Sequence, residues 1–134
     1  MTIEWNVCDD EVFEILGVVY DIKKAKTILK GKRRISVRHV DVKDLEPLLS
    51  RTITLPNGMV RIRFGVRVDW ERAQTDASID TNVPLVLAHF AFDPTLTMVP
   101  IDGYHRIARA VLRNVSSLPS VLLSKKESNA VLIR

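Results

Sequence analysis

Apolar and polar residues alternate along residues 60–69, which is the pattern of a half-buried β-strand. One face carries Val60, Ile62, Phe64, Val66 and Val68, and the other carries Arg61, Arg63, Arg67 and Asp69. Asn57-Gly58 stands between this run and an earlier β-rich run, and glycine supplies the positive φ that a tight turn needs. The pattern predicts a β-hairpin whose second strand bears a row of arginines.

Residues 22–30 instead show the spacing of an amphipathic helix, with apolar residues at positions 22, 25, 28 and 29. Asp21 precedes them as a good N-cap, and Gly31 follows at the C-terminal cap position. We therefore predict a helix over residues 22–30. Along residues 12–20 the apolar residues are too crowded to show a period, so a buried strand and a helix are both open there.

The remaining pattern of strands and helices predicts an α/β or α+β protein. Further strands are expected over residues 35–42, 83–90, 97–101 and 118–123. The sequence of a strand, a helix and a strand over residues 97–123 has the length of a crossover that joins two strands of one sheet.

Helices are expected over residues 43–49, which Pro47 interrupts, and over residues 104–113, which Asn114 closes. Residues 70–82 are polar and contain several capping residues, so they form a short helix or a loop. The turn FDPT is expected at residues 92–95, and residues 125–134 either begin a last helix or form an edge strand.

A length of 134 residues suits one domain, which we expect to span residues 1–134. No apolar run approaches the length of about 20 residues that crosses a membrane, and the N-terminus lacks the pattern of a secretory signal. The single cysteine, Cys8, has no disulfide partner and stands beside two acids that disfavour a thiolate. These features predict a soluble, cytoplasmic protein with an inert cysteine.

The net charge of +4 is distributed unevenly along the chain. The first 22 residues contain six acids and no Lys or Arg, whereas all 20 Lys and Arg residues follow, against 10 acids. The basic part would attract polyanions such as nucleic acid or nucleotide phosphates. Alternatively, the acidic first 22 residues fold back and neutralise part of this positive charge.

Two groups of cations are candidates for non-specific nucleic-acid contact: Lys23, Lys24, Lys26, Lys30, Lys32, Arg33 and Arg34 around the first helix, and Arg61, Arg63 and Arg67 on the hairpin. The alternative is that both groups are solvated faces, with the last cations of the helix complementing its dipole. Only 6% of the residues are aromatic, so no stacking platform for single strands is expected.

Residues 102–106, Asp-Gly-Tyr-His-Arg, join an apolar strand to a helix. Asp102 is expected to cap this helix, and Gly103 lets its backbone approach a ligand closely. The free N–H groups at a helix N-terminus favour an anion, and Arg106 is near enough to hold a phosphate there. Helical spacing places Arg109 and Arg113 on the same side as Arg106.

The stretch DGYHRIARA, followed by LPSVLL, resembles the ParB/sulfiredoxin superfamily, mainly over residues 83–124. The resemblance implies the mixed sheet of that family, with a C-terminal strand-helix-strand unit whose helix N-terminus binds nucleotide phosphates. The ligand is ATP in sulfiredoxins and CTP in partition proteins, and a free-serine kinase uses a similar site. The implied phosphate-binding residues are Gly103, Tyr104, His105, Arg106 and Arg109. ISVRHVDVKDLEPLL also looks like the family's first strand and short helix.

Two departures from the family's sequence pattern limit which of its activities we expect. Sulfiredoxin needs a cysteine where this chain has Tyr104, so repair of sulfinic acids is not expected. The chain ends at Arg134, before the second nucleotide motif and the helix-turn-helix of partition proteins. We therefore expect a standalone domain without specific centromere binding.

Three classes of function follow as expectations. The first is a nucleotide-dependent phosphotransferase or hydrolase, in which His105 or Asp102 moves a proton or orients a metal-bound water. Glu71, Asp76 and Asp80 offer carboxylates for a magnesium ion or a base. No protein-held metal site of the zinc type is expected, because the three histidines are scattered singly.

The second class is a basic, DNA-associated accessory protein, since some relatives are nucleases. The third is a protein-interaction module with a degenerate site that forms a homodimer. Trp5, Trp70 and Phe92 are its aromatic interface candidates, although burial would explain each of them as well.

Overall fold

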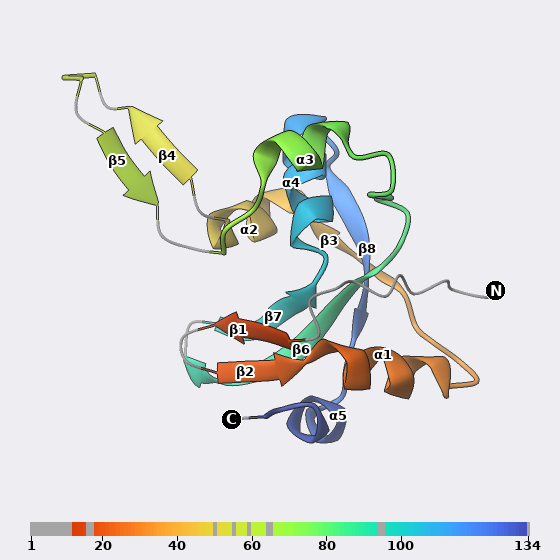
Figure 1. Cartoon of the computed structure of the whole chain (residues 1–134). Coiled ribbons are helices and arrows are strands. Elements are labelled where there is room, and N and C mark those ends of the chain that lie inside the picture. Colours follow the sequence, from red (N-terminus) through yellow and green to blue (C-terminus); the bar gives the residue numbers. More distant parts are fainter. Residues whose placement is uncertain are drawn as a thin grey trace. The chain divides into compact units, whose positions relative to one another are not determined.

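The computed structural model describes residues 12–15, 18–49, 51–54, 56–58, 60–63, 66–93 and 96–133, and it has the expected α+β architecture (Figure 1). The strands are β1 (Val12–Ile15), β2 (Val18–Asp21), β3 (Arg38–Asp41), β4 (Arg51–Thr54), β5 (Val60–Arg63), β6 (Leu85–Asp93), β7 (Leu96–Asp102) and β8 (Ser117–Leu122). The helices are α1 (Ile22–Lys30), α2 (Val42–Leu45), the 3₁₀ helix η1 (Glu46–Leu48), α3 (Trp70–Thr75), α4 (Tyr104–Leu112) and α5 (Lys125–Ala130).

The largest sheet is mixed and has the strand order β3-β8-β6-β7. Strand β6 runs antiparallel to β7 and parallel to β8. The predicted unit β7-α4-β8 therefore does connect two strands of one sheet, but β6 lies between them and they run in opposite directions. The parallel connection is the longer one from β6 to β8, because neighbours are chosen by the packing of the whole sheet and not by adjacency in sequence.

The chain divides into two compact units. Unit 1 comprises Met1–Arg38, Asn82–Gly103 and Pro119–Arg134, and unit 2 comprises His39–Thr81 and Tyr104–Leu118. The expectation of one domain over residues 1–134 stays a prediction.

In unit 1, the crowded apolar run before α1 forms a hairpin, in which Val12 pairs with Asp21 and Ile15 with Val18. Helix α1 then begins and ends where its capping residues predict. The Asp21 carboxylate accepts the Lys24 N–H at 2.9 Å, and Gly31 follows the last helical residue. The core of this unit contains Tyr20, Ala25, Leu29, Val86, Ala88, Phe90, Val99, Ile101, Val121, Leu123 and Val131.

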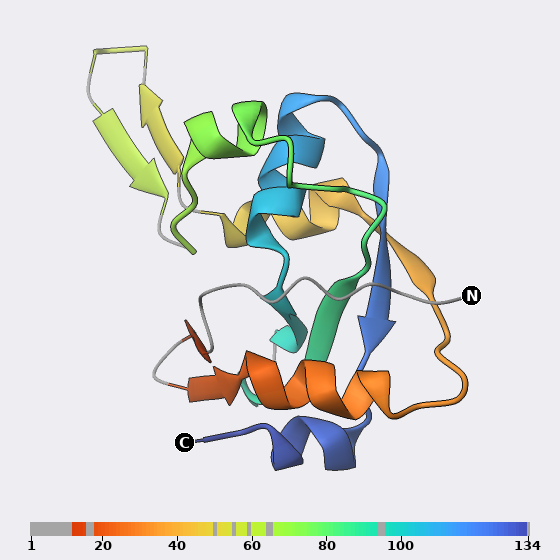
Figure 2. The same cartoon turned by 45° about the vertical axis from the view of Figure 1, so that its right-hand side comes forward.

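The end of the chain begins a helix, which settles the alternative left open by the sequence. Ser124 forms a capping box with Glu127: the Ser124 hydroxyl accepts the Glu127 N–H, and the Glu127 carboxylate accepts the Ser124 N–H. Figures 1 and 2 show α5 beside α1, and Lys32 after α1 lies 2.7 Å from a carboxylate oxygen of Glu127. Beyond α5, Leu132 bridges to Tyr20 of β2.

In unit 2, helix α4 contacts α2, η1 and α3. Strands β4 and β5 form the predicted antiparallel hairpin, and Gly58 in its turn has a φ of 82°. Strand β5 covers Val60–Arg63, and further along the predicted strand Val66 makes an isolated bridge to Leu49. Asn114, with a φ of 54°, closes α4 as expected.

Several predictions fall outside the described residues. Residues 1–11, with Trp5 and Cys8, and the last two residues of the turn predicted over residues 92–95 are among them. The side chains of Arg61, Arg63 and Phe92 are as well. The first two residues of that predicted turn belong to β6 instead. Within the described ranges, no helix combines the length and the apolar character needed to cross a membrane.

Candidate functional site

The turn before α4 has a backbone that strongly favours glycine. Gly103 has a φ of 111° and separates the end of β7 from the first residue of α4, Tyr104. By these bounds Gly103 stands at the N-cap position, and Asp102 lies one residue earlier, inside the strand. The expectation that Asp102 caps this helix stays a prediction.

The carboxylate of Asp102 forms an ion pair inside unit 1. Its Oδ2 atom lies 3.4 Å from the Nζ atom of Lys26, and the two side chains are only 8% and 7% exposed. Lys26 is therefore not part of an exposed basic surface, which corrects its assignment as a nucleic-acid contact. The sequence held a signal for this burial, since helical spacing places position 26 on the same face as Ile22 and Leu29.

The first turn of α4 presents side chains of different burial. Tyr104 is buried, and this burial raises the pKa of its hydroxyl, so the phenol stays neutral. His105 and Arg106 are half-buried. Of the phosphate-binding residues that the family resemblance implies on α4, His105 and Arg106 are thus the two with partial access to solvent.

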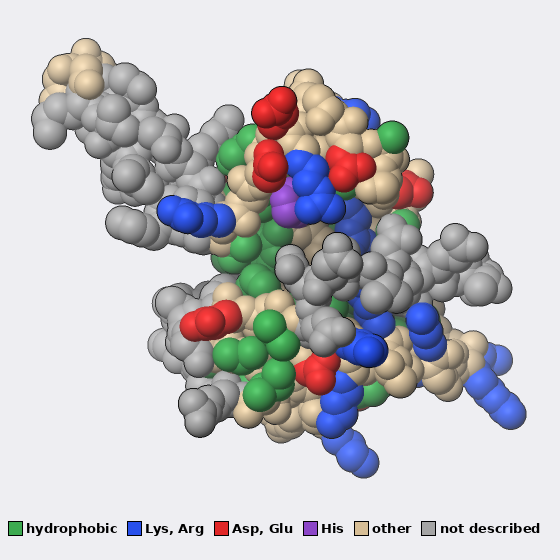
Figure 3. All heavy atoms as spheres, in the orientation of Figure 1, with side chains coloured by type: hydrophobic (Ala, Val, Ile, Leu, Met, Phe, Trp, Pro, Cys, Tyr) green, Lys and Arg blue, Asp and Glu red, His purple; other side chains and the backbone are tan. Residues whose placement is uncertain are grey.

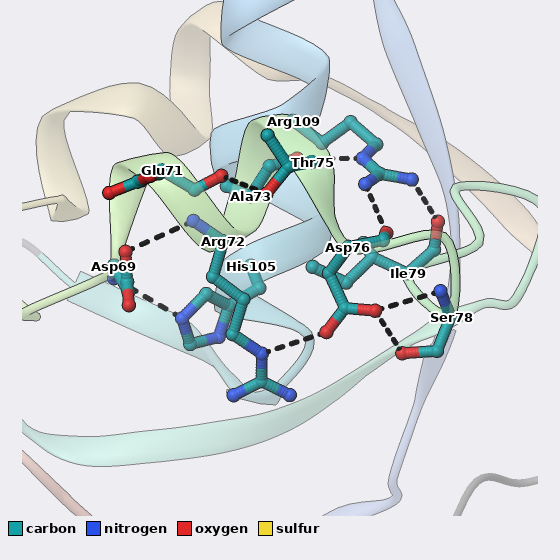
Figure 4. A network of polar contacts seen from close by, with 10 residues as sticks. All are labelled: Asp69, Glu71, Arg72, Ala73, Thr75, Asp76, Ser78, Ile79, His105 and Arg109. Carbon is teal, nitrogen blue, oxygen red and sulfur yellow. Dashed lines mark hydrogen bonds and ion pairs between the residues drawn. The ribbon is translucent and has the colours of Figure 1, made fainter.

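His105 is held by the start of α3 within unit 2. Its Nε2 atom accepts the backbone N–H of Asp69 at 3.2 Å, as Figure 4 shows. A ring nitrogen that accepts a hydrogen bond carries no proton, so the proton of this neutral imidazole is on Nδ1. Asp69 in turn caps α3 by accepting the Arg72 N–H at 3.0 Å.

Arg109 faces backbone carbonyls and not the helix N-terminus. Its buried guanidinium donates from Nε to the carbonyl of Ala73 at 2.7 Å, and from its two terminal nitrogens to the carbonyls of Ile79 and Asp76 (Figure 4). Helical spacing alone groups Arg109 with Arg106, but the packing of residues 73–79 against α4 decides its partners. We therefore leave Arg109 out of the candidate phosphate site.

The carboxylate of Asp76 is occupied by its neighbours. It accepts the hydroxyl of Ser78 at 2.6 Å, the Ser78 N–H at 2.9 Å and the Arg72 Nε–H at 3.0 Å. These hydrogen bonds, that of the Ser78 hydroxyl foremost, lower its pKa to about 2. Glu71 and Asp80 are exposed, and among the described residues no three His, Cys, Asp or Glu side chains are grouped to hold a metal ion.

An exposed cluster of cations remains on unit 1 after Lys26 is removed. We call it the α1 basic surface, and it consists of Lys23, Lys24, Lys30, Lys32, Arg33 and Arg34. Figure 3 shows Lys and Arg side chains along the region where Figure 1 places α1. Arg67, on unit 2, is exposed too.

A pocket of about 360 Å³ in unit 2, which the sequence did not suggest, lies between the start of α2 and the last turn of α4. Val42, Ala110, Val111 and Val115 provide apolar lining, and Asp41, Lys43 and Glu46 provide charges.

Comparison of the chain with protein-family models, with curated protein sequences and with solved structures found no match. The resemblance to the ParB/sulfiredoxin superfamily therefore stays a prediction that rests on the residues at the start of α4.

Proposed function

We propose that this chain binds the phosphates of a nucleotide, ATP or CTP by the family resemblance, at the first turn of α4. The observation that carries the proposal is the φ of 111° at Gly103, directly before a helix that opens with Tyr104-His105-Arg106. A residue with a side chain would be strained in that conformation, and the lack of a Cβ atom at a glycine allows a ligand to approach its backbone closely. Glycine-rich turns that lead into a helix N-terminus bind phosphate in P-loop and dinucleotide-binding proteins.

The side chains of this turn suit an anion. The first N–H groups of a helix lack partners within the helix, and the helix dipole favours negative charge beside them. Arg106 can add a charge-assisted hydrogen bond, and the Nδ1–H of His105 is a donor because its Nε2 atom accepts the Asp69 N–H.

For a phosphotransferase or hydrolase reaction, His105 is the side chain of this turn that can move a proton. Asp102 is assigned a structural role instead, because its carboxylate is paired with Lys26 in a buried environment.

The test is a thermal-shift screen with ATP, ADP, CTP and GTP, each with and without magnesium. A ligand at a hundred times its dissociation constant adds about 2.7 kcal/mol to the free energy of unfolding, so a true site gives a clear rise in Tm. We expect Arg106→Ala to abolish the shift. Arg113→Ala is the matched control, because Arg113 is an exposed arginine on the same chain segment with one 3.4 Å hydrogen bond to the Gln74 carbonyl.

Two results would contradict the proposal. One is the absence of a shift with every nucleotide. The other is an Arg106→Ala variant that binds as tightly as the wild-type protein, since the proposal requires a contact between this guanidinium and a phosphate.

A second candidate function is non-specific DNA binding through the α1 basic surface. It is favoured by the exposure of Lys23, Lys24 and Lys30 on one helix, followed by three further cations within four residues. Such binding weakens steeply with salt, because phosphate contacts release counterions. We expect retardation of duplex DNA at low ionic strength that Lys23→Gln with Lys24→Gln reduces, whereas the same change at Lys125 and Lys126 leaves it intact. Unretarded DNA at low salt would exclude this function.

A further inference from the structure

The pairing between β6 and β7 shifts by one residue just before the turn. Val86 pairs with Asp102, but its neighbour Leu87 pairs with Pro100, so Ile101 is the extra residue of β7. In a regular strand Ile101 and Asp102 would point to opposite faces of the sheet. An extra residue breaks this alternation and redirects the side chain that follows.

The redirected side chain reaches the helix that covers the core of unit 1. Ile101 belongs to the core cluster together with Ala25 and Leu29 of α1. Lys26 is on the same helix, and its ammonium lies 3.4 Å from the Asp102 carboxylate. The irregularity in β7 thus accounts for a contact between α1 and the last residue of the strand.

An ion pair in this position is not what packing alone would select. Lys26 and Asp102 are more than nine-tenths buried, and removing two charges from water costs more than a pair of apolar side chains of similar volume would. The energetic return comes only when both charges hold each other in a defined geometry. A buried pair of this kind therefore specifies where the end of β7 lies relative to α1.

The residue held in this way is the one before Gly103. We infer that Lys26 is a positioning residue: through Asp102 it fixes the end of β7 and so maintains the turn at Gly103, on which the proposed anion site depends. The inference rests on the proposed function for its consequence in binding. Its consequence for the turn itself does not require a ligand.

Two measurements on Lys26→Met test it. The first is hydrogen exchange of the Gly103, Tyr104 and His105 amides in the ligand-free protein, and the second is the dissociation constant of the nucleotide found in the thermal-shift screen. The matched control is Leu29→Ala, which destabilises the same helix by leaving a cavity and leaves both charges in place. Lys26→Arg retains a cation that can reach Asp102.

We expect exchange at these three amides to be on the order of tenfold faster in Lys26→Met than in Leu29→Ala, with a loss of nucleotide affinity of similar size, which corresponds to a typical coupling between neighbouring residues. Lys26→Arg should stay close to the wild-type protein. If Lys26→Met does not fold, Lys26→Met with Asp102→Asn removes both charges and restores folding. The three amides should still exchange faster than in Leu29→Ala.

Equal exchange at the three amides in the Lys26 variants and in Leu29→Ala would overturn the inference, whether or not a nucleotide binds. A wild-type protein that binds no nucleotide would instead remove the proposed function, and the exchange measurement would still decide the role of Lys26. Fast exchange at the turn together with unchanged nucleotide affinity would also overturn it, because the site would then not depend on the turn.

Discussion

The two units bury a cation in different ways. In unit 1, the ammonium of Lys26 meets the carboxylate of Asp102, whereas in unit 2 the guanidinium of Arg109 meets the backbone carbonyls of Ala73, Asp76 and Ile79. An ammonium is a compact point charge, and one anion can balance it. A guanidinium is planar with five N–H donors in a fixed fork, so it can serve several neutral acceptors at once.

This difference determines how much of the backbone each cation holds in place. The contact of Lys26 is with a single side chain, that of Asp102, so it fixes one point, the end of β7 before Gly103. Arg109 joins one side chain to three points of the backbone, and so it sets the path of residues 73–79 against α4. A single substitution should therefore affect a turn in unit 1 and a whole segment in unit 2.

The largest effect is expected for Arg109→Met. This change leaves buried carbonyls without a donor, and we expect the free energy of unfolding to fall by about 4 kcal/mol. Urea denaturation measures this fall. Arg113→Met is the control, because it removes one long, exposed hydrogen bond and should cost less than about 0.5 kcal/mol. A cost below about 1 kcal/mol for Arg109→Met would mean that residues 73–79 hold their path without it.

A smaller loss, about 3 kcal/mol, is expected for Lys26→Met, because it removes the cation that balances the buried Asp102 carboxylate. Adding Asp102→Asn should recover more than half of the loss, since both charges are then absent. Urea denaturation of the four proteins of this double-mutant cycle gives the coupling. Losses that simply add would show that the two side chains do not interact.

The turn after the ion pair provides the next test. Gly103→Ala should cost about 1 to 2 kcal/mol, because its φ of 111° strains any residue with a Cβ atom. Gly31→Ala is the matched control: Gly31 has a φ of −79° and an added Cβ would meet only ordinary contacts. We expect that variant to be at least as stable as the wild-type protein by thermal denaturation. Equal stabilities of the two variants would contradict a demanding turn at Gly103.

The smallest effect is expected for the pKa of the Asp76 carboxyl group, which lies in the segment that Arg109 contacts. Ser78→Ala should raise the pKa of Asp76 from about 2 toward its ordinary value of 3.8, as measured by NMR titration of the carboxyl carbon. Because the pKa is lower in the folded protein, this contribution to stability is present above 3.8 and lost as the pH falls toward 2. Ser78→Thr keeps the hydroxyl and should keep the low pKa. An unchanged pKa in Ser78→Ala would assign the effect to the Ser78 N–H and Arg72 instead.

Local signals predicted the elements well because they act over a few residues. The cap of α1 at Asp21, the turn at Gly58 and the end of α4 at Asn114 each depend on backbone conformations that their own side chains favour. Along residues 12–20 no such signal divides the apolar run, which forms two strands that pair with each other, and Tyr20 also bridges to Leu132. The α+β class was therefore readable, and the strand order was not.

The candidate site likewise has some features that the local sequence determines and others that depend on tertiary packing. The sequence by itself determined that Gly103 opens a helix bearing His105 and Arg106, because glycine and helical periodicity act locally. Only the tertiary structure decided that Arg109 turns to the carbonyls of residues 73–79, that His105 accepts the Asp69 N–H and that Lys26 pairs with Asp102. Each of these partners is at least 30 residues away along the chain. The partner of a buried polar group is set by which elements pack together, and no pattern within one helix or strand contains that information.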